Sequence, residues 1–281
     1  MRIVDAQVHL WENPGAPPIH GPSFTYQQAL TGMDEAGIDL AINCPPIWDP
    51  AAMAYSVEAH LAHPDRFVTH GWVDLLGPDA SASLDATLAL PGMVGMRFIT
   101  ASPVAAPGET NTMNRIRWPQ DNSLDWFWER MAASGRPVAV CGGAILPHVD
   151  RVARRHPELK LIIDHFGASI MGPGLVQFDG LFDFAQLPNV AIKLTGGAGY
   201  FDEAYPMPSL SREVRKLYDA FGPNRLFWGT DFTRMRLSWR ECLTLYTEEM
   251  DWLTDRDRSL IAGEGLLLWH GMAIDRGGAI G

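Results

Sequence analysis

The chain has 281 residues, 47% of them hydrophobic, with a formal net charge of −11 and a pI near 5.2. This composition predicts a well-cored globular protein and excludes a chain that is mainly disordered. An acidic chain without a Lys/Arg cluster is not expected to bind nucleic acid, so we expect a small molecule as its partner.

The cysteines indicate the compartment. Cys44, Cys141 and Cys242 are odd in number and widely spaced, which is typical of reduced thiols in a cytoplasmic protein, and no CxxC pair is present to hold zinc. The first predicted strand begins near residue 3, which leaves no room for a signal peptide. No apolar run reaches the ~18 residues that a membrane span requires. We therefore expect a cytoplasmic protein without a membrane segment.

Short β-rich runs alternate with stretches of helical periodicity along the whole chain. Apolar residues in 145–156 repeat at helical spacing, and Asp49-Pro50 is typical of the N-cap and first residue of a helix that ends near His60. Eight alternations without a compositional break favour a single, distorted (β/α)₈ TIM barrel over residues 1–281, rather than a doubly wound sheet. The predicted strands are Ile3–His9, Leu40–Asn43, Phe67–Val73, Val94–Ile99, Val138–Cys141, Leu159–Asp164, Val190–Leu194 and Leu226–Gly229.

The active site of such a barrel is built from the loops that follow the strands. Two of these loops are longer than the others, Thr100–Asn122 and Gly196–Pro208. In the first strand, "VDAQVHLW", a period of two places Val4, Val8 and Leu10 on one face and three polar residues on the other: Asp5, Gln7 and His9. We expect these polar residues to face the active-site end of the barrel.

Polar residues recur at the ends of other predicted strands. A lone strand histidine is usually a hydrogen-bonded core residue, but several polar strand ends in one barrel face a common pocket. The convergent candidates are Gln7, His9, Arg97, Cys141, His165 and Asp231.

Five motifs carry a family resemblance: "VDAQVHLW" at the start, "VGMRFI" at 94–99, "LIIDHFG" at 161–167, "AIKLTGG" at 191–197 and "LFWGTDF" at 226–232. In this order they resemble the amidohydrolase-2 branch of the amidohydrolase superfamily. That branch includes sugar lactonases, the 2-pyrone-4,6-dicarboxylate lactonase and metal-dependent decarboxylases. The resemblance implies a (β/α)₈ barrel with its site at the strand C-termini.

The metal-ligand pattern of that branch is changed at two positions in this chain. Gln7 stands where the first histidine of the family's His-x-His belongs, and Cys141 lies near the position of a strand-five histidine. His9, His165 and Asp231 match the remaining ligand positions. Because a Gln carbonyl is a weak and seldom-used metal donor, a metal-independent site is favoured, although a Cys141 thiolate could bind zinc.

The resemblance to the metal-independent pyrone lactonase suggests hydrolysis of a carboxylated lactone or pyrone-like ring. Asp231 would be the general base, provided that burial raises its pKa or that His165 shares the proton. His9 and His165 would donate hydrogen bonds to the carbonyl oxygen. The Gln7 amide would donate to the same oxygen or orient His9.

Arginines and aromatic residues are the candidate substrate contacts. Arg97 has inward parity and suits capture of a substrate carboxylate, but an ion pair with a barrel carboxylate such as Asp5 is the alternative. Lys193 also has inward parity, and we expect a carboxylate neighbour to satisfy its charge. The further candidates are Arg234, Arg115 and Arg117 as anion anchors, and Trp48 and Tyr200 as walls for a planar ligand.

Two alternatives stay open. The first is a metal-dependent hydrolase or decarboxylase that holds one zinc or manganese ion through His9, His165 and Asp231, with Cys141 as a further donor. The second is a non-catalytic barrel that binds a ligand after losing its metal. The substrate is expected to be anionic, and the resemblance also implies a homo-oligomer.

Overall fold

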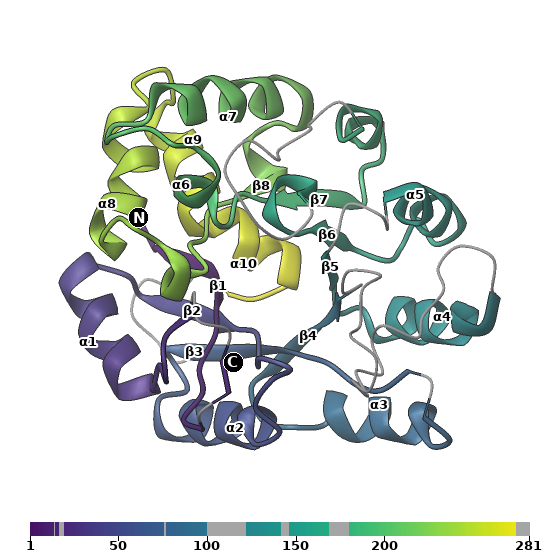
Figure 1. Ribbon diagram of the computed structural model, residues 1–281. Helices are drawn as coiled ribbons and strands as arrows, with labels where there is room; N and C mark the ends of the chain where they lie inside the picture. Colours follow the sequence, from purple (N-terminus) through teal and green to yellow (C-terminus); the bar gives the residue numbers. More distant parts are fainter. Residues whose placement is uncertain are drawn as a thin grey trace.

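The computed structural model describes residues 1–13, 15–16, 20–75, 77–99, 122–141, 146–168 and 180–273, and these form a parallel barrel surrounded by helices (Figure 1). The strands pair in chain order. The last strand region returns to the first, where Ala6 N donates to Trp228 O at 3.1 Å and Asp231 N donates to Gln7 O at 2.9 Å. The predicted distorted (β/α)₈ barrel is therefore confirmed. The strands are β1 (Val4–Val8), β2 (Leu40–Asn43), β3 (Phe67–Gly71), β4 (Met93–Ile99), β5 (Val138–Cys141), β6 (Leu161–Ile163), β7 (Val190–Lys193) and β8 (Leu226–Phe227).

The helices follow the strands around the outside of the barrel, except for the last one, which lies across its centre in Figure 1. Among the described residues no helix is long and apolar enough to cross a membrane. The helices are α1 (Tyr26–Ala36), α2 (Ala52–Ala62), α3 (Ala80–Leu88), α4 (Asp125–Ser134), α5 (Leu146–Arg155), α6 (Gly197–Tyr200), α7 (Pro208–Phe221), α8 (Trp239–Thr244), α9 (Asp255–Ser259) and α10 (Gly265–His270).

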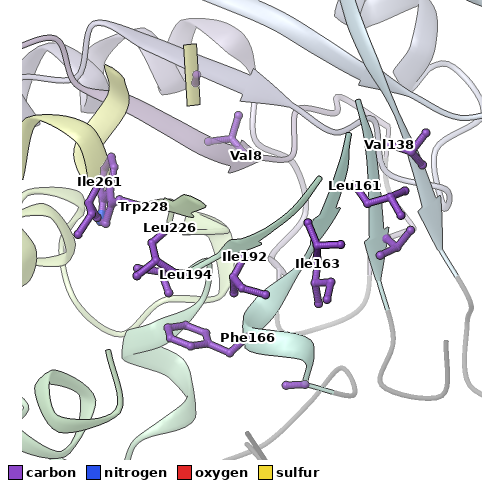
Figure 2. Close-up of a cluster of buried hydrophobic side chains, with 14 of the residues drawn as sticks. Val8, Val138, Leu161, Ile163, Phe166, Ile192, Leu194, Leu226, Trp228 and Ile261 are labelled. Atoms are coloured by element: carbon purple, nitrogen blue, oxygen red, sulfur yellow. The ribbon is translucent and has the colours of Figure 1, made fainter. Parts of the chain in front are cut away.

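Alternate strand residues divide the hydrophobic core into two layers. The outer layer lies between strands and helices, and Figure 2 shows part of it, including Ile163, Ile192 and Trp228. The inner layer fills the barrel, and Leu266 and Leu267 of α10 belong to it. The last helix therefore plugs the N-terminal end of the barrel and leaves the opposite end for polar residues.

The predicted elements agree with the structure except at their ends and in one loop. The helix expected from Asp49-Pro50 begins at Ala52, because the Asp49 carboxylate accepts from Ala51 N at 2.9 Å and caps the preceding turn. Strand β8 is shorter than predicted. The loop predicted at Thr100–Asn122 lies outside the described residues except for Asn122, and Gly196–Pro208 contains the short helix α6.

One correction concerns the first strand. The register of β1 against β2 shifts between Asp5 and Val8, as in a β-bulge, so the alternation of side chains is interrupted. Gln7 points into the barrel, whereas Asp5 points outward to α8. The expectation that Asp5 shares the inner face with Gln7 and His9 is therefore wrong.

Asp5 joins the two edges of the barrel. Its Oδ1 accepts from Gln7 N at 3.0 Å and Thr230 N at 2.9 Å, and its Oδ2 accepts from Thr230 Oγ1 at 2.5 Å and Trp239 Nε1 at 2.7 Å. Burial raises the pKa of Asp5 to about 6 against the effect of these donors. At pH 7.5 the side chain is therefore an ionised acceptor for all four contacts.

Two imidazoles meet inside the barrel near α10. His70 Nε2 lies 2.7 Å from His270 Nε2, and His270 Nδ1 donates to Leu266 O. Gly95 leaves room for this pair, because a Cβ there would lie 2.8 Å from His70 Nε2. Burial lowers the pKa of His70 well below its usual value and that of His270 to about 4. Both rings are therefore neutral near pH 7, and His70 is fully buried.

Asp5→Asn should destabilise the fold at pH 7.5. An amide nitrogen at this position would face N–H or O–H donors, and each buried donor left unpaired costs about 1–3 kcal/mol. Urea denaturation should show a loss of at least about 2 kcal/mol in the free energy of unfolding. Asp34→Asn, on the exposed face of α1, is the control. A loss for Asp5→Asn no larger than the control would contradict this role.

Stability should fall as the pH drops from about 6.5 to about 4. In this window a histidine of the unfolded chain binds a proton, whereas His70 and His270 stay neutral in the folded protein. Each of the two imidazoles therefore contributes up to about 1.4 kcal/mol per pH unit to the slope of the unfolding free energy against pH. His270→Gln should reduce the slope of unfolding free energy against pH, whereas His63→Gln, at a partly buried position that follows α2, should not. Equal slopes for the two variants would be inconsistent with this account.

Candidate active site

The C-terminal end of the barrel brings together polar residues that are far apart in the sequence. All are buried, and each comes from a strand or from the residues directly after one. They are His9 after β1, Arg97 on β4, Cys141 at the end of β5, His165 after β6 and Asp231 after β8. The structure thus places the predicted site residues in one region.

The backbone at two of these residues is unusual. His165 has φ of 54° and Asp231 has φ of 55°, so both lie in the left-handed region that non-glycine residues rarely adopt. Thr195 Oγ1 accepts from His165 N at 3.3 Å, and Gln7 O accepts from Asp231 N at 2.9 Å. Backbone strain of this kind is concentrated at functional sites.

Five buried side chains form what we call the polar ring: Gln7, Arg97, Asp164, His165 and Lys193. Asp164 Oδ2 accepts from Arg97 Nε at 2.7 Å, and Asp164 Oδ1 lies 3.1 Å from the Lys193 ammonium. Lys193 donates to Gln7 Oε1 at 3.4 Å, so the Gln7 amide nitrogen faces His165 Nε2 at 3.3 Å. Arg97 Nη2 lies 3.3 Å from the same imidazole nitrogen and completes the ring.

The polar ring changes two expectations and confirms one. The carboxylate that pairs with Arg97 is Asp164, not Asp5. Gln7 contacts His165, not His9. The expected carboxylate neighbour of Lys193 is present and is also Asp164.

His165 is a neutral acceptor in this geometry. Its Nε2 faces two nitrogen donors, which assigns the lone pair to Nε2 and the proton to Nδ1. Nδ1 lies 2.9 Å from Thr195 Oγ1. Burial, reinforced by Arg234, lowers the pKa of His165 to about 3. The arrangement does not support the predicted donation from His165 to a carbonyl oxygen.

Asp231 is held as a carboxylate. Its Oδ1 lies 3.2 Å from His9 Nε2, and its Oδ2 lies 2.6 Å from Arg234 Nε and 3.9 Å from His165 Nε2. Burial works against the charge, but Arg234 and His9 outweigh it and hold the pKa of Asp231 well below its usual value. Of the two conditions stated for Asp231 as general base, a pKa raised by burial is therefore not met, because these neighbours outweigh burial.

His9 links Asp231 to the second strand. Its Nδ1 lies 2.5 Å from Cys44 O, while its Nε2 faces Asp231. Both ring nitrogens thus face oxygen acceptors, and the ring can donate from either of them. His9 is thus placed to donate toward the carboxylate and toward any atom bound beside it.

The donor set fits a divalent ion poorly. Among the described residues, Cys141, Asp164 and His165 bring one donor atom each within 4.8 Å of one another. Both Asp164 oxygens contact cations, and His165 Nε2 accepts from the polar ring. Burial raises the pKa of the Cys141 thiol to about 11, which disfavours a thiolate. In the alternative trio, Asp231 lies 3.2 Å from His9 Nε2 and 3.9 Å from His165 Nε2, but its Oδ2 is already paired with Arg234 at 2.6 Å.

The remaining substrate candidates differ in position. Arg234 donates to Tyr200 Oη at 2.9 Å, beside Asp231. Burial lowers the pKa of Arg234, but Asp231 more than compensates and raises it. The Trp48 ring lies 5.8 Å from that of His9, at the edge of the site. The other two predicted anchors, Arg115 and Arg117, lie outside the described residues.

Three residues of the site were missed by the sequence analysis. Asp164 has the same inward parity as Ile162 on β6, so the strand pattern could have identified it. Thr195 contacts His165 through backbone geometry that the sequence does not reveal. The His20 ring lies 4.8 Å from that of Trp48, tilted by 36°, and its Nδ1 contacts Thr233, but no periodic pattern marks this residue.

Known proteins resemble this chain in sequence and in fold. The L-fucono-1,5-lactonase of Burkholderia ambifaria is 31% identical over 174 residues, which cover 60% of this chain and 56% of that protein, so the chain spans about half the length of this curated relative. An amidohydrolase from Burkholderia multivorans with bound zinc shares the fold, with a TM-score of 0.76 and 21% identity over 96% of this chain and 99% of that chain. A Pseudomonas putida protein assigned as a 2-pyrone-4,6-dicarboxylic acid hydrolase has a TM-score of 0.72 and 17% identity over 96% and 97% of the two chains.

A family model described as "Amidohydrolase" matches residues 4–241. The match includes every strand of the barrel and the residues that converge at its C-terminal end. The chain belongs to the amidohydrolase family.

Proposed function

We propose that this chain hydrolyses a lactone without a metal ion, with Asp231 as the general base. The observation that carries the proposal is the contact set of Asp231, an ionised carboxylate at the strand C-termini beside His9, His165 and Arg234. The similarity to an L-fucono-1,5-lactonase and the fold shared with a 2-pyrone-4,6-dicarboxylic acid hydrolase support a lactone as the substrate.

The reaction needs one proton acceptor and one stabilised oxyanion. Water attacks the lactone carbonyl carbon while Asp231 accepts its proton, and a tetrahedral oxyanion forms. The ring C–O bond then breaks, and Asp231 returns the proton to the leaving oxygen, which yields a hydroxy acid. His9 holds the carboxylate through its 3.2 Å contact.

The charges of the site support an anionic substrate. Arg97, Lys193 and Arg234 provide three cations against the two carboxylates of Asp164 and Asp231. A substrate carboxylate that takes over Arg234 weakens the contact that depresses the pKa of Asp231. Binding of an anion at Arg234 would thereby make Asp231 a stronger base. Trp48 and Tyr200 are proposed to flank the substrate.

The polar ring supports metal independence. A divalent ion at His165 Nε2 would need the lone pair that Gln7 and Arg97 occupy, and it would lie beside a guanidinium. The family alternative, zinc or manganese held by His9, His165 and Asp231, has the zinc-bound Burkholderia multivorans protein in its favour. Its hydrolase or decarboxylase chemistry is therefore the second candidate.

The proposal also covers the compartment, the partner and the assembly of the protein. The three cysteines are buried thiols rather than disulfides, which suits a reducing compartment, and we propose the cytoplasm. The partner is a small anionic molecule. Assembly into a homo-oligomer stays a prediction.

Asp231→Asn should abolish most of the turnover. The amide retains the shape of the side chain but accepts no proton, so kcat on carboxylated lactones should fall about 10²–10⁴-fold. Asp202→Asn, in an exposed pair with Arg236, is the control. Lactone opening is followed by acid release in a pH-indicator assay. Ligand binding without any turnover in the unaltered protein would favour the non-catalytic barrel instead.

Metal removal should leave activity unchanged. After dialysis against a chelator, turnover should equal that of untreated protein, and elemental analysis should find less than stoichiometric zinc or manganese. Gln7→His alone should not create a tight zinc site, because Arg97 and Lys193 remain. Titration calorimetry with zinc chloride measures this. One equivalent of metal lost together with activity would establish the metal-dependent alternative.

A further inference from the structure

We propose that Arg97 is the catalytic electrophile of this site, and that its Nη2 donates to the lactone carbonyl oxygen as this oxygen becomes an oxyanion. This inference rests on the proposed lactone hydrolysis and gives Arg97 a role different from carboxylate capture. The guanidinium then supplies the positive charge that stabilises the transition state.

Arg97 is preorganised for such a role. It extends inward from β4, its side chain is 7% exposed, and its Nε donates to Asp164 at 2.7 Å. Burial opposes its charge, but Asp164 outweighs burial and raises the pKa of Arg97 above its usual value. A permanently ionised donor fixed on a strand requires little reorganisation when charge develops on the substrate.

The position of Nη2 also suits this role. Arg97 Nη2 lies 3.3 Å from His165 Nε2, and this imidazole nitrogen lies 3.9 Å from Asp231 Oδ2. Arg97 and Asp231 are thus the electrophilic and basic groups around one imidazole. A carbonyl placed beside His165 can meet the guanidinium at its oxygen and a water activated by Asp231 at its carbon.

Both nitrogens that face His165 Nε2 have hydrogens available for a substrate. Arg97 Nη2 carries two hydrogens, and within the described part of the chain its acceptor is His165. The Gln7 amide nitrogen also carries two hydrogens and faces the same imidazole nitrogen. Each group can therefore donate to the substrate oxygen through the hydrogen that is not directed at His165. Lys193 fixes the amide orientation through Gln7 Oε1.

Arg234 differs from Arg97 in its partners. It pairs with Asp231 and Tyr200, and its Nη2 lies 3.4 Å from His165 Nδ1, on the side of the imidazole away from Nε2. Arg97 is tied to Asp164, a carboxylate that takes no part in proton transfer. Substrate capture by Arg234 releases the base, whereas Arg97 can keep Nε on Asp164 while its Nη2 donates to the substrate.

The test measures kcat and KM for Arg97→Gln and Arg97→Lys on two lactones of equal ring size, one carboxylated and one neutral. An electrophile acts on the carbonyl of both, so kcat should fall about 10²–10³-fold on each, with KM changed only a few-fold. Arg97→Lys keeps a charge beside Asp164 and retains the fold, which circular dichroism verifies. Arg130→Gln, in an exposed pair with Asp85, is the control.

Chemical rescue separates a missing donor from a distorted site. Added guanidinium ion should restore part of the kcat of Arg97→Ala on both lactones. A raised KM confined to the carboxylated lactone, with kcat retained, would overturn the proposal and make Arg97 an anion anchor. Hydrolysis of the same lactones by the unaltered protein tests the proposed function separately.

Discussion

The polar interior of this barrel depends on one carboxylate. Asp164 is fully buried and contacts the guanidinium of Arg97 on one side and the ammonium of Lys193 on the other. Two unpaired cations in a barrel interior would shift their pKa or unfold the protein, because desolvation of a charge costs several kcal/mol. With Asp164 in place, both cations remain charged and become fixed donors. The orientation of Gln7 and the tautomer of His165 follow from these donors.

The residue at position 7 therefore has to match Lys193, which donates to it. A metal-ligating histidine at position 7 would use its lone pair on the ion and leave the Lys193 ammonium with one fewer acceptor. Gln7 accepts from Lys193 and also presents an amide nitrogen to His165. The same residue that removes a metal ligand thus satisfies a buried cation. These two contacts explain the presence of a glutamine at position 7 without any argument about how well its carbonyl binds a metal ion.

The sequence was sufficient for the barrel and for the convergence of the site, since β-rich runs and polar strand ends depend on local periodicity. It was insufficient where one residue shifts the register. The bulge in β1 turned Asp5 outward to Trp239, and no feature of "VDAQVHLW" marks that shift. The protonation states of the site residues could not be predicted from the sequence either. A pKa of Asp231 raised by burial was one of two conditions for its role as general base, but the short contact to Arg234, which lowers this pKa, depends on a left-handed turn that strand patterns do not encode.

The plug formed by α10 bears on the order in which the chain becomes compact. Leu266 and Leu267 fill the same interior layer as Val4 and Ala6, so residues from the two extremes of the described chain share one apolar space. Such contacts have a very large separation in sequence and are expected to form late. During synthesis the strands emerge from the ribosome before the residues that seal their lower end. A nascent chain ending before residue 265 would thus expose the barrel interior to water, however complete its upper, polar end.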